Sequence, residues 1–183
     1  MTTYVALLRA INVGGRNRVS MADLRHLLAN LGFANVRSIL QSGNLVFERD
    51  VSTTPRLEGL LKGAAKARLA LETEFFVRSA KEWRAIVTAN PFPNEAKRDP
   101  AHLVVTLLKN AADRKHVAAL QKLIPGREAI RGGGRHICIV YPDGIGESRL
   151  TNALIEQKLG AQGTARNWNT VLKLASLAAQ QLA

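Results

Sequence analysis

The order of its periodic segments constrains the fold of this chain most. In the first half, strand-like apolar runs occur at 4–10, 36–40, 45–48 and 73–77. Helical spacing of apolar residues follows Ser20 and again follows Thr54-Pro55, where proline suits a first helical position. Gln41-Ser42-Gly43-Asn44 separates the second and third runs as a hairpin-type turn. The resulting order is β-α-β-β-α-β, the ferredoxin-like pattern.

The second half repeats this plan with a strand, a helix from Asn110 or Asp113 to Pro125-Gly126, and a hairpin across Gly132-Gly133-Gly134. A helix capped by Ser148 and running to about Leu159 then precedes the final helix. We therefore predict an α+β protein of two tandem ferredoxin-like units, each followed by an extra helix. The units are expected at 1–92 and 101–183, with a proline-containing linker at 93–100.

The two tryptophans of the chain suggest that the units arose by duplication. Aligning Trp83 with Trp168 also aligns Ser79 with Thr164 as helix caps, and places an apolar pair after each tryptophan. This alignment puts Arg166-Asn167-Trp168-Asn169 in the first turn of the last helix. Chance similarity between two amphipathic helices is the alternative.

The net charge of +12 favours anionic partners such as a phosphorylated metabolite or nucleic acid. The excess is diffuse, because each half carries 13 basic and 7 acidic residues, and a solvated basic surface would look the same. Aromatic residues make up only 5% of the chain, which disfavours a base-stacking RNA site. Electrostatic attachment to a nucleic-acid backbone stays open.

Several functional classes receive no support from the sequence. The single cysteine, Cys138, lies in an apolar strand-like run and reads as a small buried hydrophobe, so neither a disulfide nor a zinc site is expected. There is no transmembrane-length apolar run, no signal peptide, and no catalytic or metal-binding motif. We expect a cytoplasmic protein without membrane association, metal or cofactor, and favour a non-enzyme. Catalysis by residues assembled only in the fold stays open.

Two polar segments are candidate anion sites. The loop Asn12–Arg18 follows a strand and precedes a helix, where backbone N–H groups and Arg16 can hold an anion; a solvated turn is the alternative. At Arg166–Asn169, unpaired N–H groups favour an anionic ligand, but the residues alone favour an inward-packed Trp168 with capping neighbours. Arg131-Gly132-Gly133-Gly134-Arg135 is expected to be a flexible hairpin tip.

Five sequence blocks together resemble the bacterial family named domain of unknown function 1697. They are Tyr4–Val19, Gln41–Phe47, Asn90-Pro91-Phe92, Tyr141–Gly146 and Thr164–Val171. Ala10 departs from the family pattern, which has glycine there, and this suggests a backbone that does not require glycine. The resemblance implies a compact bacterial cytoplasmic α+β protein and implies no activity.

The polar residues of these blocks favour a groove lined by the first loop, the first hairpin and the start of the last helix. The candidate ligand-binding residues are Arg9, Asn12, Gly14, Gly15, Arg16, Asn17, Gln41, Ser42, Asn44, Arg166, Asn167, Trp168 and Asn169. We hypothesise a non-enzymatic binding module, monomeric or homodimeric, for a phosphorylated small molecule or a nucleic-acid backbone. The alternatives are a small-molecule enzyme with Asp143 or a histidine as base, and a subunit of a larger assembly.

Overall fold

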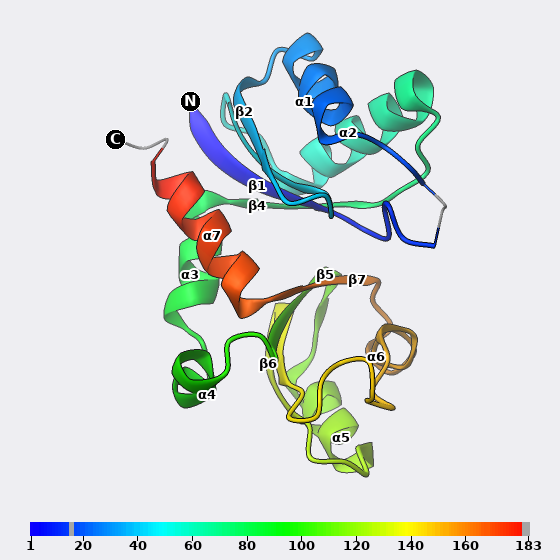
Figure 1. The fold of residues 1–183 in the computed structure, drawn as a ribbon, viewed down its shortest axis with the longest axis vertical. Helices are drawn as coiled ribbons and strands as arrows, with labels where there is room; N and C mark the ends of the chain where they lie inside the picture. The colour runs from blue at the N-terminus through cyan, green and yellow to red at the C-terminus, as the bar shows by residue number, and fades with distance from the viewer. Residues whose placement is uncertain (15–16, 181–183) are drawn as a thin grey trace. The chain divides into compact units, whose positions relative to one another are not determined.

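The computed structural model describes residues 1–14 and 17–180, which form two compact units. The first unit comprises Met1–Ala85 together with the described residues from Lys173 onward, and the second comprises Ile86–Leu172. The chain crosses between them within two helices, α3 (Ala80–Thr88) and α7 (Trp168–Ala179), which are labelled in Figure 1. No helix in the described ranges combines the length and the apolar character needed to cross a bilayer.

The first unit has the predicted β-α-β-β-α-β chain order. Its elements are β1 (Thr2–Leu8), α1 (Met21–Asn30), β2 (Ala34–Ile39), β3 (Asn44–Arg49), α2 (Thr54–Leu69) and β4 (Phe75–Ser79). The strands lie in the order β2-β3-β1-β4, and each neighbouring pair is antiparallel. Both α1 and α2 pack on one face of this sheet (Figure 1), over a core that includes Tyr4, Leu28 and Phe47.

The second unit differs from the prediction. It contains α4 (Pro93–Arg98), β5 (Leu103–Ala112), α5 (Arg114–Leu123), β6 (Ala129–Val140), α6 (Asn152–Leu159) and β7 (Gly163–Asn167). Its described strands form a three-stranded antiparallel sheet, β6-β5-β7, rather than a second four-stranded one. The chain is therefore a mixed α+β protein, and a matched pair of ferredoxin-like units is not observed.

The long element β6 spans the predicted hairpin at 127–141. It is continuous through all three glycines, but it pairs with β5 only through Gly134 and residues 136–140. The register shifts between the pairs Leu107–His136 and Ala112–Gly134, so the ladder is irregular at the glycines. An added Cβ on Gly132 would stand 3.1 Å from the carbonyl oxygen of His136 and 3.1 Å from Cα of Ile137, so the backbone before the glycines folds back on the backbone after them, as the predicted hairpin requires.

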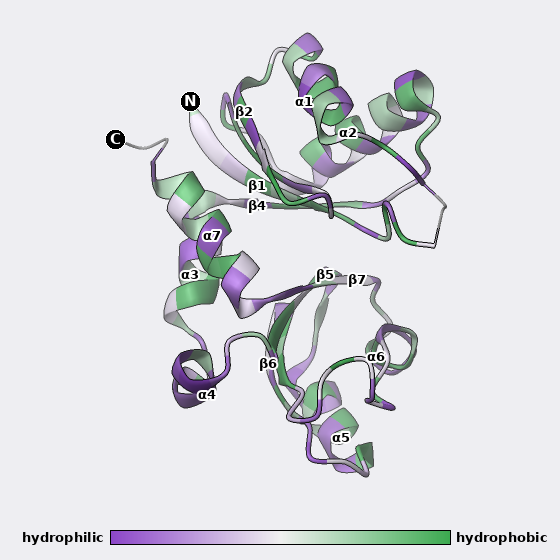
Figure 2. Cartoon of the chain, in the orientation of Figure 1, coloured by the Kyte–Doolittle hydropathy of each residue, from purple (hydrophilic) through white to green (hydrophobic). Residues whose placement is uncertain are grey.

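The stretch 93–100, predicted as a linker, contains the helix α4, which buries none of its residues and is hydrophilic over most of its length (Figure 2). Its role as a linker stays a prediction. The helix expected to begin after Ser148 begins after Thr151, whose hydroxyl accepts a 3.2 Å hydrogen bond from the N–H of Leu154.

The edge strands β4 and β7 show a repeat between the two units. The residues that correspond in them differ from those of the predicted alignment. Ser79 ends β4 and accepts from the N–H of Glu82, while Asn167 ends β7 and accepts from the N–H of Thr170. The alignment through Thr164 is therefore wrong, and the two tryptophans do not match. The matching residues are Arg78 and Arg166, each of which donates to the carbonyl of the residue before it.

Ala10 lies in the left-handed region with φ 49°, a conformation that favours glycine. The sequence had suggested a backbone that does not require glycine at this position. An alanine there is strained by roughly 1–2 kcal/mol. The substitution Ala10→Gly is therefore expected to raise the free energy of unfolding by about 1 kcal/mol in urea denaturation. Ala85→Gly, inside the exposed part of α3, should lower it by a similar amount. Equal effects of both substitutions would contradict the assigned strain.

Candidate functional site

A cavity of about 560 Å³ lies entirely within the second unit. Its walls come from the end of α5, the segment that leads into β6, the loop after β6, and α6. The lining residues are Leu120, Leu123, Ile124, Pro125, Gly126, Arg127, Glu128, Tyr141, Asp143, Gly144, Glu147, Ser148, Arg149, Leu150, Leu154 and Lys158. Its volume falls in the range of about 300–1,000 Å³ that is typical of small-molecule sites.

The apolar side of the cavity arises where α5 ends. The apolar residues of this helix recur at helical spacing, and Val117 and Leu120 are buried. Leu123, in the last turn before Pro125-Gly126, is 63% exposed. An incompletely covered helix stripe of this kind leaves an apolar surface beside the cavity.

The opposite side of the cavity carries a chain of hydrogen bonds. The hydroxyl of Ser148 donates to Oε1 of Glu128 and accepts a 3.0 Å hydrogen bond from the N–H of Leu150. The hydroxyl of Tyr141 donates to the carbonyl of Leu150 at 3.2 Å. Burial, and then the negative charge of Glu128, raise the pKa of Tyr141 above its usual value, so this phenol stays a neutral donor.

Oε2 of Glu128 is the exception in this chain of bonds. This oxygen exposes less than 1 Å² and accepts no hydrogen bond from any residue that the structure describes. Buried polar atoms in proteins are nearly always hydrogen-bonded. The unsatisfied oxygen therefore distinguishes this wall from an ordinary packed surface.

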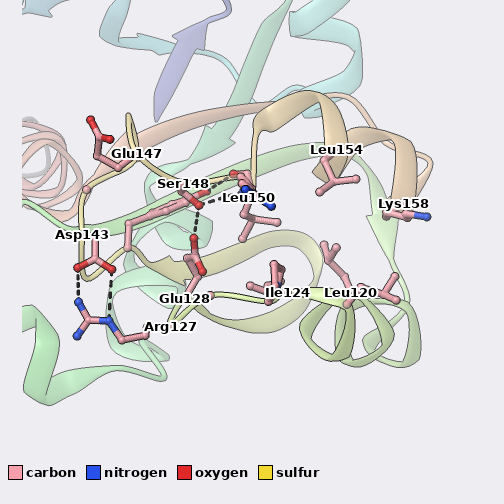
Figure 3. Close-up of a pocket in the computed structure, with 16 residues that line it drawn as sticks. Leu120, Ile124, Arg127, Glu128, Asp143, Glu147, Ser148, Leu150, Leu154 and Lys158 are labelled. Atoms are coloured by element: carbon pink, nitrogen blue, oxygen red, sulfur yellow. Dashed lines mark hydrogen bonds and ion pairs between the residues drawn. The ribbon is translucent and has the colours of Figure 1, made fainter.

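Charged side chains surround the cavity. Arg127 and Asp143 form an exposed ion pair, with 3.3 Å between Nε and Oδ2, whereas Arg149 and Lys158 make no ion pair within the described ranges. In Figure 3 the labelled polar groups lie to the left of the view, Leu120, Ile124 and Leu154 lie to the right, and Lys158 lies beyond them. The cavity is thus polar at one end, apolar in the middle and basic at the other end.

Among the described residues, the cysteine, histidine and acidic side chains considered for catalysis or metal binding do not form a site. Cys138 is buried, and burial raises the pKa of its thiol to about 12. Among the described residues no group of three or more His, Cys, Asp and Glu side chains could hold a metal ion. Asp143, a candidate base, is engaged by Arg127, and the nearby imidazole of His102 bonds the carboxylate of Asp99 at 2.7 Å.

The first loop and the first hairpin meet, and their polar side chains organise the backbone. Asn12 Nδ2 donates to the carbonyls of Val19 and Gln41 at 3.0 and 2.8 Å, and its Oδ1 accepts from the N–H of Val19. The buried Asn44 donates to the carbonyl of Ile39 and to the hydroxyl of Ser42. Local turn geometry therefore accounts for these residue types without a ligand.

The other candidates near the first loop are half-buried or exposed. Arg9 and Asn17 line a hollow of about 430 Å³ together with Lys62 and Lys66, which pair with Glu74 and Glu72. Gly14 is exposed with φ 60°. Gly15 and Arg16 lie outside the described residues. Ligand binding by this set stays a prediction.

The third predicted segment belongs to the second unit and lies at the junction of β7 and α7. Arg166 and Asn167 are strand residues and not part of the first helical turn; Trp168 is buried and Asn169 is exposed. Arg166 donates to Thr164 and Ala165, and burial lowers its pKa to about 10, so it remains charged at neutral pH. The hydrogen bond from Asn12 to the carbonyl of Gln41 joins two of the three predicted segments, the first loop and the first hairpin. Both of these segments belong to the first unit.

Comparisons with known proteins agree with the resemblance of the sequence blocks. Among solved structures, the chain is similar to the conserved bacterial protein SP0830 from Streptococcus pneumoniae, with a TM-score of 0.74 and 26% sequence identity. The likeness covers 97% of this chain and 98% of that chain. Among curated proteins none matches. A sequence profile of the family described as "Protein of unknown function (DUF1697)" matches residues 1–137, and the chain belongs to this family.

Proposed function

We propose that this protein is a non-enzymatic binding protein for a small organic anion with an apolar body, held in the cavity of the second unit. The observation that carries the proposal is the cavity itself, in which apolar side chains lie between a polar wall and Lys158, a lysine with no acidic partner among the described residues. Ligand sites are commonly apolar clefts with a few polar groups that fix orientation. A bacterial origin is part of the same proposal, because the similar solved protein is bacterial, and a cytoplasmic location is proposed with it.

The charge of the ligand follows from the cations at the cavity. Arg149 and Lys158 are exposed, line the cavity and have no described acidic partner, whereas Arg127 is already neutralised by Asp143. An anionic group bound at either cation would gain charge-assisted hydrogen bonds without first breaking an ion pair. The net charge of +12 would further favour the approach of an anion.

The alternative functions receive less support. A nucleic-acid backbone requires an extended basic groove, and this cavity has an apolar middle. An enzyme requires an available acid or base, and the candidate Asp143 is held in an ion pair. The proposed role is therefore recognition of a phosphorylated or carboxylated molecule with a hydrocarbon portion.

Octyl phosphate is a suitable probe, measured by its displacement of the fluorescent anion anilinonaphthalene sulfonate from the full chain. Substituting Arg149 and Lys158 together with alanine is expected to weaken octyl phosphate about tenfold or more, because hydrogen bonds to charged groups contribute about 1.5–3 kcal/mol. Uncharged octanol should lose no more than about twofold in affinity, since its binding depends on apolar burial.

The matched control is the pair Lys81→Ala and Arg84→Ala, which removes the same charge from exposed positions of α3 that do not line the cavity. It is expected to leave both affinities close to those of the natural protein. An equal loss of octyl phosphate affinity in the control would show that the probe responds only to net charge. No saturable displacement by octyl phosphate would contradict the proposed function.

A further inference from the structure

The carboxylate of Glu128 is the group in the cavity whose hydrogen-bonding capacity is incompletely used. Ser148 and Tyr141 both donate to described acceptors, and the backbone N–H of Leu150 is satisfied by Ser148. Among the described residues that line the cavity, Oε2 of Glu128 is the buried side-chain oxygen without a described hydrogen-bond partner. The polar wall therefore has an acceptor to offer a ligand and no spare donor among these groups.

We infer that the ligand of this cavity carries a hydrogen-bond donor, a hydroxyl or an ammonium, that pairs with Oε2 of Glu128. The inference rests on the proposed function and narrows its ligand class. In the unliganded protein the carboxylate oxygen is already withdrawn from solvent. A ligand donor would therefore gain a charge-assisted hydrogen bond without the desolvation of this oxygen opposing it.

The position of Glu128 lets its carboxylate make this bond. Oε2 lies against Gly126, where an added Cβ would stand only 2.1 Å from it. Glu128 also lines the cavity, and the terminal torsion of a glutamate is soft. The inferred bond requires a rotation about this torsion that turns Oε2 from Gly126 toward the cavity, and the same rotation shifts Oε1 relative to the hydroxyl of Ser148.

The two ends of the cavity then specify a ligand with two functional groups. Figure 3 shows Glu128 and Lys158 separated by the side chains of Leu120, Ile124 and Leu154. A donor at Glu128 and an anion at Lys158 require a hydrocarbon portion between them. The ligand class is a hydroxy acid or amino acid with its two polar groups at opposite ends of an apolar chain, or the corresponding phosphate.

The test compares hexanoate, octanoate and decanoate with their ω-hydroxy and ω-amino counterparts by displacement of anilinonaphthalene sulfonate. At the chain length that spans the cavity, the donor-bearing compound is expected to bind about tenfold tighter than the plain alkanoate. The hydroxy and amino series show which of the two donors is preferred. Because the natural protein is used, this comparison does not depend on any substitution being tolerated.

One variant assigns the gain to Glu128. Glu128→Gln removes the charge with little change in shape. It should reduce the tenfold gain to about twofold or less while plain octanoate binds as before.

The outcomes separate the inference from the proposed function. No gain from the donor at any chain length would overturn the inference, as would a gain that persists in Glu128→Gln, while octanoate binding would still support the proposed function. Failure of every plain alkanoate to displace the dye would overturn the proposed function itself.

Discussion

Substituting Glu58 with alanine is expected to lower the free energy of unfolding by about 3 kcal/mol, because a buried charge loses its partner. Glu58 lies in α2 with 8% of its side chain exposed, and its Oε1 stands 3.6 Å from Nη1 of Arg78, which is 3% exposed. The same oxygen accepts a 2.8 Å hydrogen bond from the N–H of Val77. The substitution therefore removes a counter-charge and the acceptor of a buried backbone donor.

Glu58→Gln separates these two contributions. The amide oxygen can still accept from the N–H of Val77, but the charge that faces Arg78 is gone. Urea denaturation should give Glu58→Gln a smaller loss than Glu58→Ala. A loss below about 1 kcal/mol for the alanine variant would contradict a stabilising role for this pair.

Gly43→Ala is expected to cost about 2–4 kcal/mol, because it combines backbone strain with a clash in the core. Gly43 has φ 70°, and an added Cβ would lie 2.7 Å from Cβ of Leu8 and 2.8 Å from Cδ1 of Ile11. Its carbonyl also accepts a 2.8 Å hydrogen bond from the N–H of Leu8, which holds the hairpin turn close to the end of β1. Moving the turn away from β1 to relieve the clash would break this hydrogen bond.

Gly32→Ala is the matched control. Gly32 also has a positive φ, 79°, but an added Cβ would meet no atom within 4 Å. The control should lose only the strain of the left-handed conformation, about 1–2 kcal/mol. Equal losses for Gly43→Ala and Gly32→Ala in urea denaturation would show that the approach of Gly43 to Leu8 is unimportant.

The elements of the first unit were predictable because their signals are local. The apolar spacing of Leu24, Leu27 and Leu28 specifies the buried face of α1, and Ser20 caps the helix through the N–H of Asp23. In the second unit, residues 136–140 of β6 pair with β5, a strand more than 20 residues earlier in the chain. The register of that pairing, and its shift near Gly134, are non-local and are not specified by the preference of glycine for turns.

The candidate site was less predictable for two physical reasons. Amide side chains such as Asn12 and Asn44 suit a ligand and a turn equally well, and here they bond the backbone. Glu128 and Ser148 are 20 residues apart in the chain, and no sequence motif indicates that they form a hydrogen bond. The exposure of Leu123 likewise depends on packing between elements, and the helical spacing of apolar residues carries no information about that.

Whether the second unit holds the ligand is tested most directly by following the backbone amide resonances of the isotope-labelled full chain during titration with octyl phosphate. We expect saturable shifts at Leu120, Ile124, Glu128, Leu150 and Leu154, which line the cavity. The amides of Leu24 and Leu61, in the core of the first unit, should not move. Shifts confined to the first unit, or spread without saturation over exposed basic residues, would contradict binding in this cavity.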